Sequence, residues 1–217
     1  NVSGNTTYSL KNGTKHLFGM NTKGFNAVQQ QKLTASDGAN NDQFGVSVSL
    51  YKDYALIGSA LAPFNGSQSG SAYIFKYNGS TWNQQQKLTV SDGAVGDVFG
   101  HSVSLYKDYA LIGAYGENSD KGSAYIFKRN GSTWNQQQKL TASDGANDDQ
   151  FGRSVSLYED YVLIGAQGDN SGYGSAYIFK RNGSNWLQQA KLIGSDIDNS
   201  DYFGSSVSIY EDFALVG

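Results

Sequence analysis

Residues 151–158, FGRSVSLY, alternate between apolar and polar side chains. In an extended chain Val155 and Leu157 fall on one side, whereas Ser154 and Ser156 fall on the other. A period of two is the pattern of a β-strand that turns one face to a core. We therefore predict a strand over these residues.

Three further strands are predicted directly after this one. Residues 161–166, YVLIGA, form a continuous apolar run of strand length, which is typical of a strand buried on both faces. Residues 174–180 and 185–192 supply the third and fourth strands, and the Asn-Gly pair between them favours a tight hairpin turn. Together the segments predict a four-stranded antiparallel unit.

The same pattern recurs along the chain. A Phe-Gly pair stands at Phe44, Phe99, Phe151 and Phe203, with spacings of 55, 52 and 52 residues. A fixed period of this length indicates a solenoid or a propeller. We predict a single domain over 1–217, which consists of an N-terminal half-blade at 1–33, repeats at about 34–88, 89–140 and 141–192, and a C-terminal half-blade at 193–217.

A four-stranded unit of this kind has apolar residues on both faces, so it is stable only when it packs between neighbouring units. Radial stacking of four-stranded units gives an all-β fold, the β-propeller, with the first strand of each blade innermost. The order Phe-Gly-x-Ser-Val, Leu-Ile-Gly-Ala, Gly-Ser-Ala-Tyr-Ile-Phe closely resembles the FG-GAP repeat of integrin α-subunit propellers and of their bacterial and protist relatives. The resemblance covers about residues 25–217.

The two ends of the chain carry complementary halves of a blade. Residues 13–26 align with 70–83, which are third and fourth strands, and residues 203–217 align with first and second strands. We expect the halves to join within the chain, which would close a ring of about four blades, the lower end of the propeller range. Completion by a neighbouring subunit and membership in a larger propeller stay open as alternatives.

Composition narrows the classes of function. The chain has 27 glycines, one proline and no cysteine, which suits strands joined by tight turns and excludes thiol catalysis and cysteine-ligated zinc. The net charge is -3 and the basic residues are spread singly, so nucleic acid is not an expected partner. No apolar run approaches the roughly 20 residues of a membrane-spanning helix, so membrane insertion is not expected.

An aspartate stands in each turn between the first and second strands. These are Asp53, Asp108, Asp160 and Asp212. The resemblance to integrin-type repeats implies an Asp-x-Asp-x-Asp-Gly calcium loop at this place. The turns here are too short to wrap an ion that takes about six to eight oxygen ligands, so we interpret these aspartates as turn-forming.

A second set of acids precedes each Phe-Gly pair, two per repeat and five residues apart. The pairs are Asp37 and Asp42, Asp92 and Asp97, Asp144 and Asp149, and Asp196 and Asp201. We interpret one member as capping the turn and the other as accepting backbone N–H bonds from the loop. The last copy is the best calcium candidate, because Asp198 adds a carboxylate to Asp196 and Asp201. We expect no other cofactor.

The chain holds seven Asn-x-Ser/Thr sequons, at Asn1, Asn5, Asn12, Asn65, Asn78, Asn130 and Asn182. The last three occupy equivalent hairpin tips. An exposed tip can accommodate an N-glycan, although turn chemistry alone also explains Asn-Gly there. We expect glycans at these tips, with Asn65 and Asn12 as further candidates, if the chain passes through a eukaryotic secretory pathway.

Positions whose residue differs between repeats are not constrained by the fold of the repeat. The residue after Phe-Gly is Val46, His101, Arg153 and Ser205 in turn, and we expect these four near the mouth of the central channel, facing a ligand. Loose packing at a rim is the alternative interpretation. The loops 59–69, 114–121 and 166–173 also vary and form the other candidate binding surface.

Catalysis finds little support in these residues. Neither His16 nor His101 lies in a Ser-His-Asp or metal-ligand pattern, so we expect no catalytic residues. The sequence favours a non-enzymatic module of extracellular or cell-surface adhesion or assembly, whose partner is a protein or a second copy. The partner would bind the propeller loops or the Gln-rich outer strands, whose edges could pair with another chain. A carbohydrate-binding propeller and a propeller hydrolase are the alternatives. The repeated Trp82, Trp134 and Trp186 look structural rather than glycan-binding.

Overall fold

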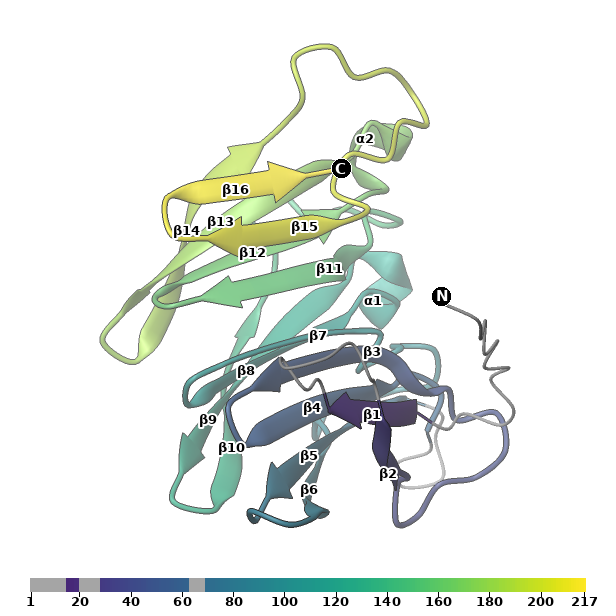
Figure 1. Ribbon diagram of the computed structural model, residues 1–217. Helices are drawn as coiled ribbons and strands as arrows, with labels where there is room; N and C mark the ends of the chain where they lie inside the picture. Colours follow the sequence, from purple (N-terminus) through teal and green to yellow (C-terminus); the bar gives the residue numbers. More distant parts are fainter. Residues whose placement is uncertain (1–14, 20–27, 63–68) are drawn as a thin grey trace, which may run out of the picture.

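The structure, a computed structural model, describes residues 15–19, 28–62 and 69–217. Three four-stranded antiparallel sheets lie one after another along the chain (Figure 1). One two-stranded sheet precedes them and another comes after them. The prediction of an all-β fold of four-stranded blades is confirmed. No helix in the described ranges is long and apolar enough to cross a membrane.

The three complete blades share one strand order, and each pairs its strands in sequence. The first blade contains β3 (Phe44–Tyr51), β4 (Tyr54–Ser59), β5 (Ser71–Tyr77) and β6 (Trp82–Leu88). The second contains β7 (Ser102–Tyr106), β8 (Tyr109–Ala114), the helical turn α1 (Glu117–Asp120), β9 (Ser123–Asn130) and β10 (Thr133–Leu140). The third contains β11 (Phe151–Tyr158), β12 (Tyr161–Ala166), the helical turn α2 (Asp169–Gly172), β13 (Ser175–Asn182) and β14 (Asn185–Leu192).

The two-stranded sheets have the pairing of half-blades. Strands β1 (Lys15–Gly19) and β2 (Val28–Leu33) pair with a bulge at the same place as β5 and β6. Strands β15 (Val207–Tyr210) and β16 (Phe213–Val216) pair as β11 and β12 do. The chain thus supplies the strands of four blades.

Closure of a four-bladed ring within the chain is not observed, and that expectation is wrong for this structure. The β15–β16 sheet lies against the third blade and the β1–β2 sheet against the first, and the two sheets stay separate (Figure 1). Each half packs on its neighbour as complete blades pack on one another. The packing contacts fix the rotation from one sheet to the next, and with this rotation the β1–β2 and β15–β16 sheets do not meet.

The phenylalanine of the Phe-Gly pair is buried in the core between neighbouring sheets. Phe151 is fully buried and meets Tyr177 and Phe179 edge-on, with ring centroids 5.4 and 6.0 Å apart. Edge-to-face rings add to the gain from burial. Phe99 makes the same contacts with Tyr125 and Phe127. The motif therefore anchors the start of a first strand in the core that its blade shares with the preceding blade.

The glycine of the pair is required by close approach between chain segments. Gly152 has a φ of +90°, and a Cβ there would overlap the carbonyl oxygen of Ser123. The Gly152 carbonyl in turn lies where a Cβ on Gly113, in the preceding blade, would stand. Only glycine fits at both places.

Serines of the innermost strands connect one blade to the next. The Oγ of Ser49 accepts the backbone N–H of Leu105 at 2.9 Å, and the Oγ of Ser104 accepts that of Leu157 at 3.0 Å. A backbone donor that faces the previous blade is thereby satisfied. Near the same strand ends, Tyr51, Tyr106, Tyr158 and Tyr210 stack in a row with ring centroids 5.0, 5.0 and 4.9 Å apart.

The Gln-Gln-Gln run of the outer strands has a structural role within the chain. The middle glutamine, Gln137 in β10, is the extra residue of a β-bulge. The third, Gln138, clamps the next blade: its Nε2 donates to the Trp186 carbonyl at 2.8 Å, and its Oε1 accepts the Trp186 N–H at 2.7 Å. Gln31 and Gln86 make equivalent pairs with Trp82 and Trp134, whereas β14 carries Ala190 at this position.

We predict that Gln138→Ala lowers the free energy of unfolding by about 1–2 kcal/mol, because the backbone groups of Trp186 lose both partners. Gln136→Ala is the matched control, since Gln136 is exposed in the same run, and its effect should stay within about 0.5 kcal/mol. Urea unfolding of both variants measures the difference. Equal losses would show that the clamp contributes nothing beyond strand propensity.

Candidate functional site

The residues after the Phe-Gly pairs lie on one rim of the blades, together with the loops between second and third strands. The loops meet there: Gly116 donates its backbone N–H to the Asp97 carbonyl at 3.2 Å, and Gly168 donates to the Asp149 carbonyl at 3.1 Å. We name this edge the loop rim. The hairpin tips occupy the opposite edge, where the Tyr77 N–H bonds the Asp53 carbonyl.

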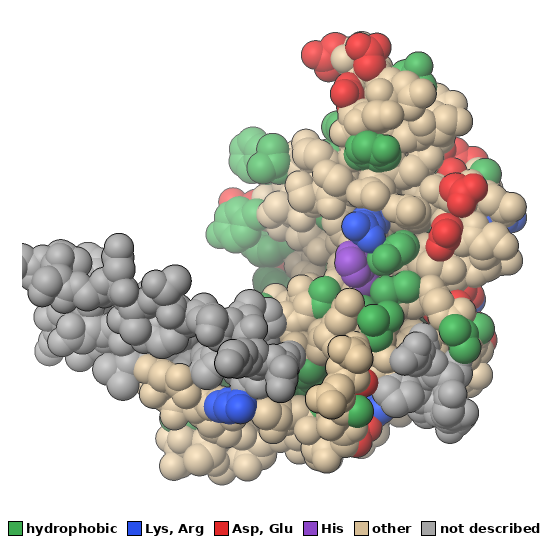
Figure 2. Space-filling view, turned by 90° about the vertical axis from the view of Figure 1, so that its right-hand side faces the viewer, with side chains coloured by type: hydrophobic (Ala, Val, Ile, Leu, Met, Phe, Trp, Pro, Cys, Tyr) green, Lys and Arg blue, Asp and Glu red, His purple; other side chains and the backbone are tan. Residues whose placement is uncertain are grey.

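Two of the four candidate ligand-facing residues come together on the loop rim. His101, before β7, lies edge-on to Tyr115 with ring centroids 4.7 Å apart. Arg153, in β11 of the next blade, places its guanidinium 4.5 Å from the centroid of the Tyr115 ring. Figure 2 shows the histidine (purple) beside a basic and several hydrophobic side chains on this face. We call these three residues the Tyr115 platform.

The other two candidates lie outside the platform. Val46 is 42% exposed at the start of β3, in the first blade. The hydroxyl of Ser205 donates to the Gly217 carbonyl at 3.2 Å, within the C-terminal half-blade. The four positions are equivalent by repeat, and the described contacts bring His101 and Arg153 together through the Tyr115 ring that lies between them.

Burial makes the imidazole of the platform neutral. It lowers the pKa of His101 to about 4, and the positive charge of Arg153 acts in the same direction. Arg153 keeps its charge and is held over the Tyr115 ring by a cation–π contact. The platform therefore offers one fixed cation, an aromatic ring and an uncharged imidazole at neutral pH.

Tyr115 was not among the residues singled out from the sequence. The available signal was its place in the variable loop 114–121, where the other repeats carry Ala60 and Gln167. Gln167 bonds Gln150 instead, through its Nε2 at 2.8 Å. An aromatic side chain at this position occurs in one blade of the three, and this is what sets the platform apart.

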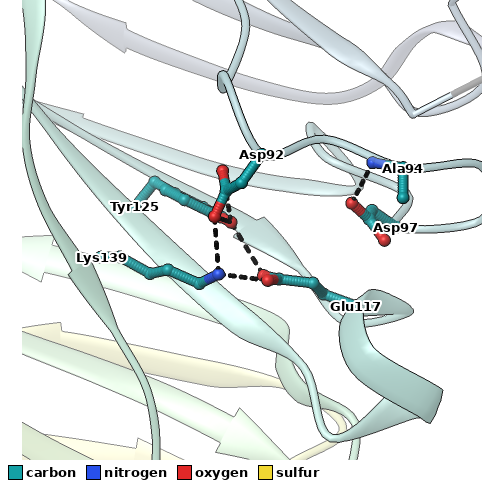
Figure 3. Close-up of polar contacts among 6 residues, drawn as sticks. All are labelled: Asp92, Ala94, Asp97, Glu117, Tyr125 and Lys139. Atoms are coloured by element: carbon teal, nitrogen blue, oxygen red, sulfur yellow. Dashed lines mark hydrogen bonds and ion pairs between the residues drawn. The ribbon is translucent and has the colours of Figure 1, made fainter. Parts of the chain in front are cut away.

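In the first three pairs before Phe-Gly, the first acid is bound by a lysine and a tyrosine of the blade that follows it. Asp92 accepts from Lys139 Nζ at 2.8 Å and lies 3.5 Å from the Tyr125 hydroxyl (Figure 3). Glu117 pairs with the same lysine and accepts from the Tyr125 hydroxyl at 2.8 Å. A pocket of about 240 Å³ opens beside these groups, but Glu117 and Lys139 on its wall are already paired.

These contacts control the charge of the acid. Burial raises the pKa of Asp92, but the bond and positive charge of Lys139 outweigh it and hold that pKa below its usual value. The same arrangement recurs with Asp37, Tyr73 and Lys87 in the first blade and with Asp144, Tyr177 and Lys191 in the third. Because the contact recurs in all three complete blades, we interpret it as structural.

The second acid of each pair caps its own loop. Asp97 accepts the backbone N–H of Ala94 at 2.6 Å (Figure 3), and Asp149 accepts that of Ala146 at 2.6 Å. Burial raises the pKa of Asp97 despite the Ala94 bond, and the charges of Glu117 and Asp92 add to the rise. Acceptance of backbone N–H bonds by one member of each pair agrees with the sequence interpretation.

The calcium candidates Asp196, Asp198 and Asp201 lie in an exposed loop before Phe203. Asp198 and Asp201 repeat the loop cap, since the Asp198 N–H donates to Asp201 Oδ2 at 2.7 Å and the Asp201 N–H donates to the Asp198 carbonyl at 3.2 Å. Across the described residues, no group of three or more His, Cys, Asp or Glu side chains is arranged to hold a metal ion. Calcium binding here stays a prediction.

The turn aspartates also have partners in the scaffold. Asp108 forms an ion pair with Arg129, and Asp160 accepts from Arg181 Nε at 2.9 Å. Each pair joins the turn between first and second strands to the third strand of the same blade. These carboxylates therefore hold the rim of the hairpin tips together.

The hairpin-tip sequons are accessible, and the repeated tryptophans are not. Asn78, Asn130 and Asn182 are exposed at the rim opposite the Tyr115 platform. Asn1, Asn5, Asn12 and Asn65 lie outside the described residues, as does the side chain of His16. Trp82, Trp134 and Trp186 are buried between blades, with at most 9% of the residue exposed, so they belong to the core.

Comparison with protein families identifies four consecutive matches along the chain. The FG-GAP repeat matches residues 27–75, 82–127, 134–179 and 186–217. Each later match begins at or near an outer-strand tryptophan and continues into the next blade. The matched unit thus spans the contacts between blades described above. A search of curated proteins finds no match to the chain.

The low pKa of His101 predicts a pH dependence of stability. The unfolded histidine takes up a proton near pH 6.5 and the folded one only near pH 4, so the unfolded state binds more protons between these values. Stability should therefore fall as pH drops from about 6.5 to about 4. Unfolding of the wild type and of His101→Gln across this range tests it, and the variant should lose less.

Proposed function

The chain belongs to the FG-GAP repeat family, and on this premise we propose that it is a non-enzymatic module that binds a protein partner in adhesion outside the cell. The binding surface is the loop rim, with the Tyr115 platform at its centre. Recognition is by shape, aromatic contact and one fixed positive charge. The chain carries out no chemistry of its own in this proposal.

The convergence of Tyr115, His101 and Arg153 is the observation that supports this surface. Tyrosine and arginine are among the side chains that most often dominate the binding energy of protein interfaces. Arg153 is held over a ring before any partner arrives, so less side-chain freedom is lost on binding. A carboxylate or a backbone carbonyl of the partner is the complementary group.

The contrast between repeated and variable residues also supports the loop rim as the binding surface. Residues that repeat between blades are engaged within the scaffold, as with Asp92 and Lys139, or Gln138 and the backbone of Trp186. Residues that differ between blades gather on the loop rim. Variable loops on a rigid repeated scaffold are the usual place for partner selection.

The alternative functions have weaker support. A carbohydrate-binding propeller would use exposed aromatic rings, but the repeated Trp134 and Trp186 are buried in the core. A hydrolase would use an imidazole oriented by a carboxylate. The described contacts of the His101 imidazole are with the ring of Tyr115 and the charge of Arg153.

We predict that Arg153→Glu reduces adhesion of beads coated with the chain to cells of its source organism by about tenfold or more, a change that corresponds to roughly 1.4 kcal/mol. The substitution reverses the one fixed charge of the platform. Lys128→Glu is the matched control, because Lys128 is an exposed base toward the opposite rim. Bead counts after washing provide the measurement.

Equal adhesion by both variants would contradict the assignment of the loop rim. Treatment of the cells with protease before the assay should abolish adhesion if the partner is a protein. Adhesion that survives protease but is lost on addition of free sugars would indicate the carbohydrate-binding alternative.

An extracellular location predicts glycans at the exposed tips. In material from a eukaryotic secretory pathway we expect Asn78, Asn130 and Asn182 to be modified, since each is accessible and lies away from the Tyr115 platform. Mass spectrometry before and after enzymatic deglycosylation reads the occupancy of each site. Unmodified asparagine at all three would count against this location.

A further inference from the structure

The loop before β7 carries valines where the other repeats carry polar residues. Val95 is 74% exposed, and its equivalents in all the other repeats are asparagines. Val98 is half-buried, and its equivalents in the first and third blades are Gln43 and Gln150. Two polar positions of the loop rim are therefore apolar in the second blade.

In the third blade the positions of Val98 and Tyr115 form a polar pair. There the Nε2 of Gln167 donates to the Oε1 of Gln150 at 2.8 Å, so the two side chains satisfy each other. In the second blade the Val98 side chain lies against the backbone of Gly116, with its Cγ2 3.0 Å from the place of a Cβ on that glycine. A hydrogen bond that closes the rim on itself is thus replaced by an aliphatic and an aromatic side chain, whose accessible surface gains from apolar contact.

The backbone makes valine an unfavourable residue at this position. Val98 has a left-handed φ of +60°, and Gln43 and Gln150 have φ values of +56° and +58° at the same place. Branching at Cβ makes this conformation more costly for valine than for the unbranched glutamine. Residues held in such conformations are concentrated at binding and active sites. The presence of Val98 therefore favours a role for its side chain beyond the fold.

The valines border the Tyr115 platform. The carbonyl of Gly96, next to Val95, lies where a Cβ on Gly116 would stand, so their loop touches the turn that carries Tyr115. Figure 2 shows several hydrophobic side chains near the histidine and a basic side chain on this face. We call the combined surface the apolar–basic patch. It consists of Val95, Val98, His101, Tyr115 and Arg153.

Arg153 supplies the charge of this patch. Its guanidinium lies 4.5 Å from the centroid of the Tyr115 ring, and none of the ion pairs among the residues that the structure describes includes it. A guanidinium can bind a carboxylate through two parallel hydrogen bonds. The surface is therefore complementary to a negative charge beside an apolar group.

We propose that the apolar–basic patch binds an extended peptide segment of the partner, in which a large apolar side chain stands two residues from an aspartate or glutamate. Side chains at i and i+2 of an extended chain point the same way and lie roughly 6–7 Å apart, so both reach one small surface. The apolar side chain covers Val98 and Tyr115, and the carboxylate pairs with Arg153. This inference rests on the proposed function, since it names the chemistry that the loop rim recognises.

A peptide array tests the chemistry of the partner. Short peptides in a Gly-Ser background sample every pair of residues at i and i+2, and the full chain with a fluorescent label is applied to them. We expect the brightest spots to combine Phe, Leu or Ile with Asp or Glu. Replacement of the acid by its amide, or of the apolar residue by alanine, should weaken binding about tenfold. A blank array, or a signal that depends on neither residue, would overturn the proposal.

Val98→Gln tests the valine without disturbing the fold. Glutamine stands at this position in two other blades with nearly the same φ, so the variant should resist urea at least as well as the wild type. Its affinity for the brightest array peptide should nevertheless fall about tenfold. Leu187→Gln is the matched control, because Leu187 is 48% exposed near the hairpin tip of β14, and it should bind as the wild type does. Unchanged affinity of Val98→Gln would contradict the inference.

A sulphated polysaccharide provides a second probe, because it offers negative charge without an apolar side chain. If it binds through Arg153 and binds Val98→Gln equally well, while the peptides do not bind, the patch recognises charge alone and the inference is wrong. The bead assay reports on the proposed function separately. Reduced adhesion of Arg153→Glu together with a blank array would retain the loop rim and overturn only the peptide. Peptide binding together with unchanged adhesion of Arg153→Glu would retain the chemistry of the patch and overturn the proposed function.

Discussion

The backbones of neighbouring blades meet at points where no side chain fits. The carbonyl of Gly152 lies where a Cβ of Gly113 would stand, and Gly100 and Gly204 make the same contact with Gly58 and Gly165. Such close approach brings the serine hydroxyls, the stacked tyrosines and the glutamine clamps within reach of the next blade. The geometry of the whole arc follows from this one contact.

The contact also separates structural from functional residues. A repeated acid such as Asp92, or a turn aspartate such as Asp108, is held by a basic side chain of its own blade, so its charge is balanced within the scaffold. On the loop rim Gly116 and Gly168 also make close backbone contacts, but the residues beside them vary between blades. Tyr115 and Arg153 can differ from their repeat equivalents there without disturbing the packing, and a binding surface can form across two blades.

Much of the fold follows from the sequence, because strand period, Asn-Gly turns and the Phe-Gly spacing are local signals. The roles of Gln138 and of Gly113 could not be predicted, since each depends on atoms of the next blade. The Tyr115 platform required the same three-dimensional information. Ring closure was mispredicted because strand count says nothing of the rotation between blades, which the packing of whole sheets determines.

Unfolding of Gly113→Ala tests the central contact most directly, with Gly145→Ala as its control, because a Cβ at Gly145 meets nothing closer than 3.4 Å. The account predicts that Gly113→Ala lowers the free energy of unfolding by about 1–3 kcal/mol or more, since the blades must move apart. The control should change it by about 0.5 kcal/mol or less. Equal stability of the two variants would contradict the claim that this contact holds the blades together.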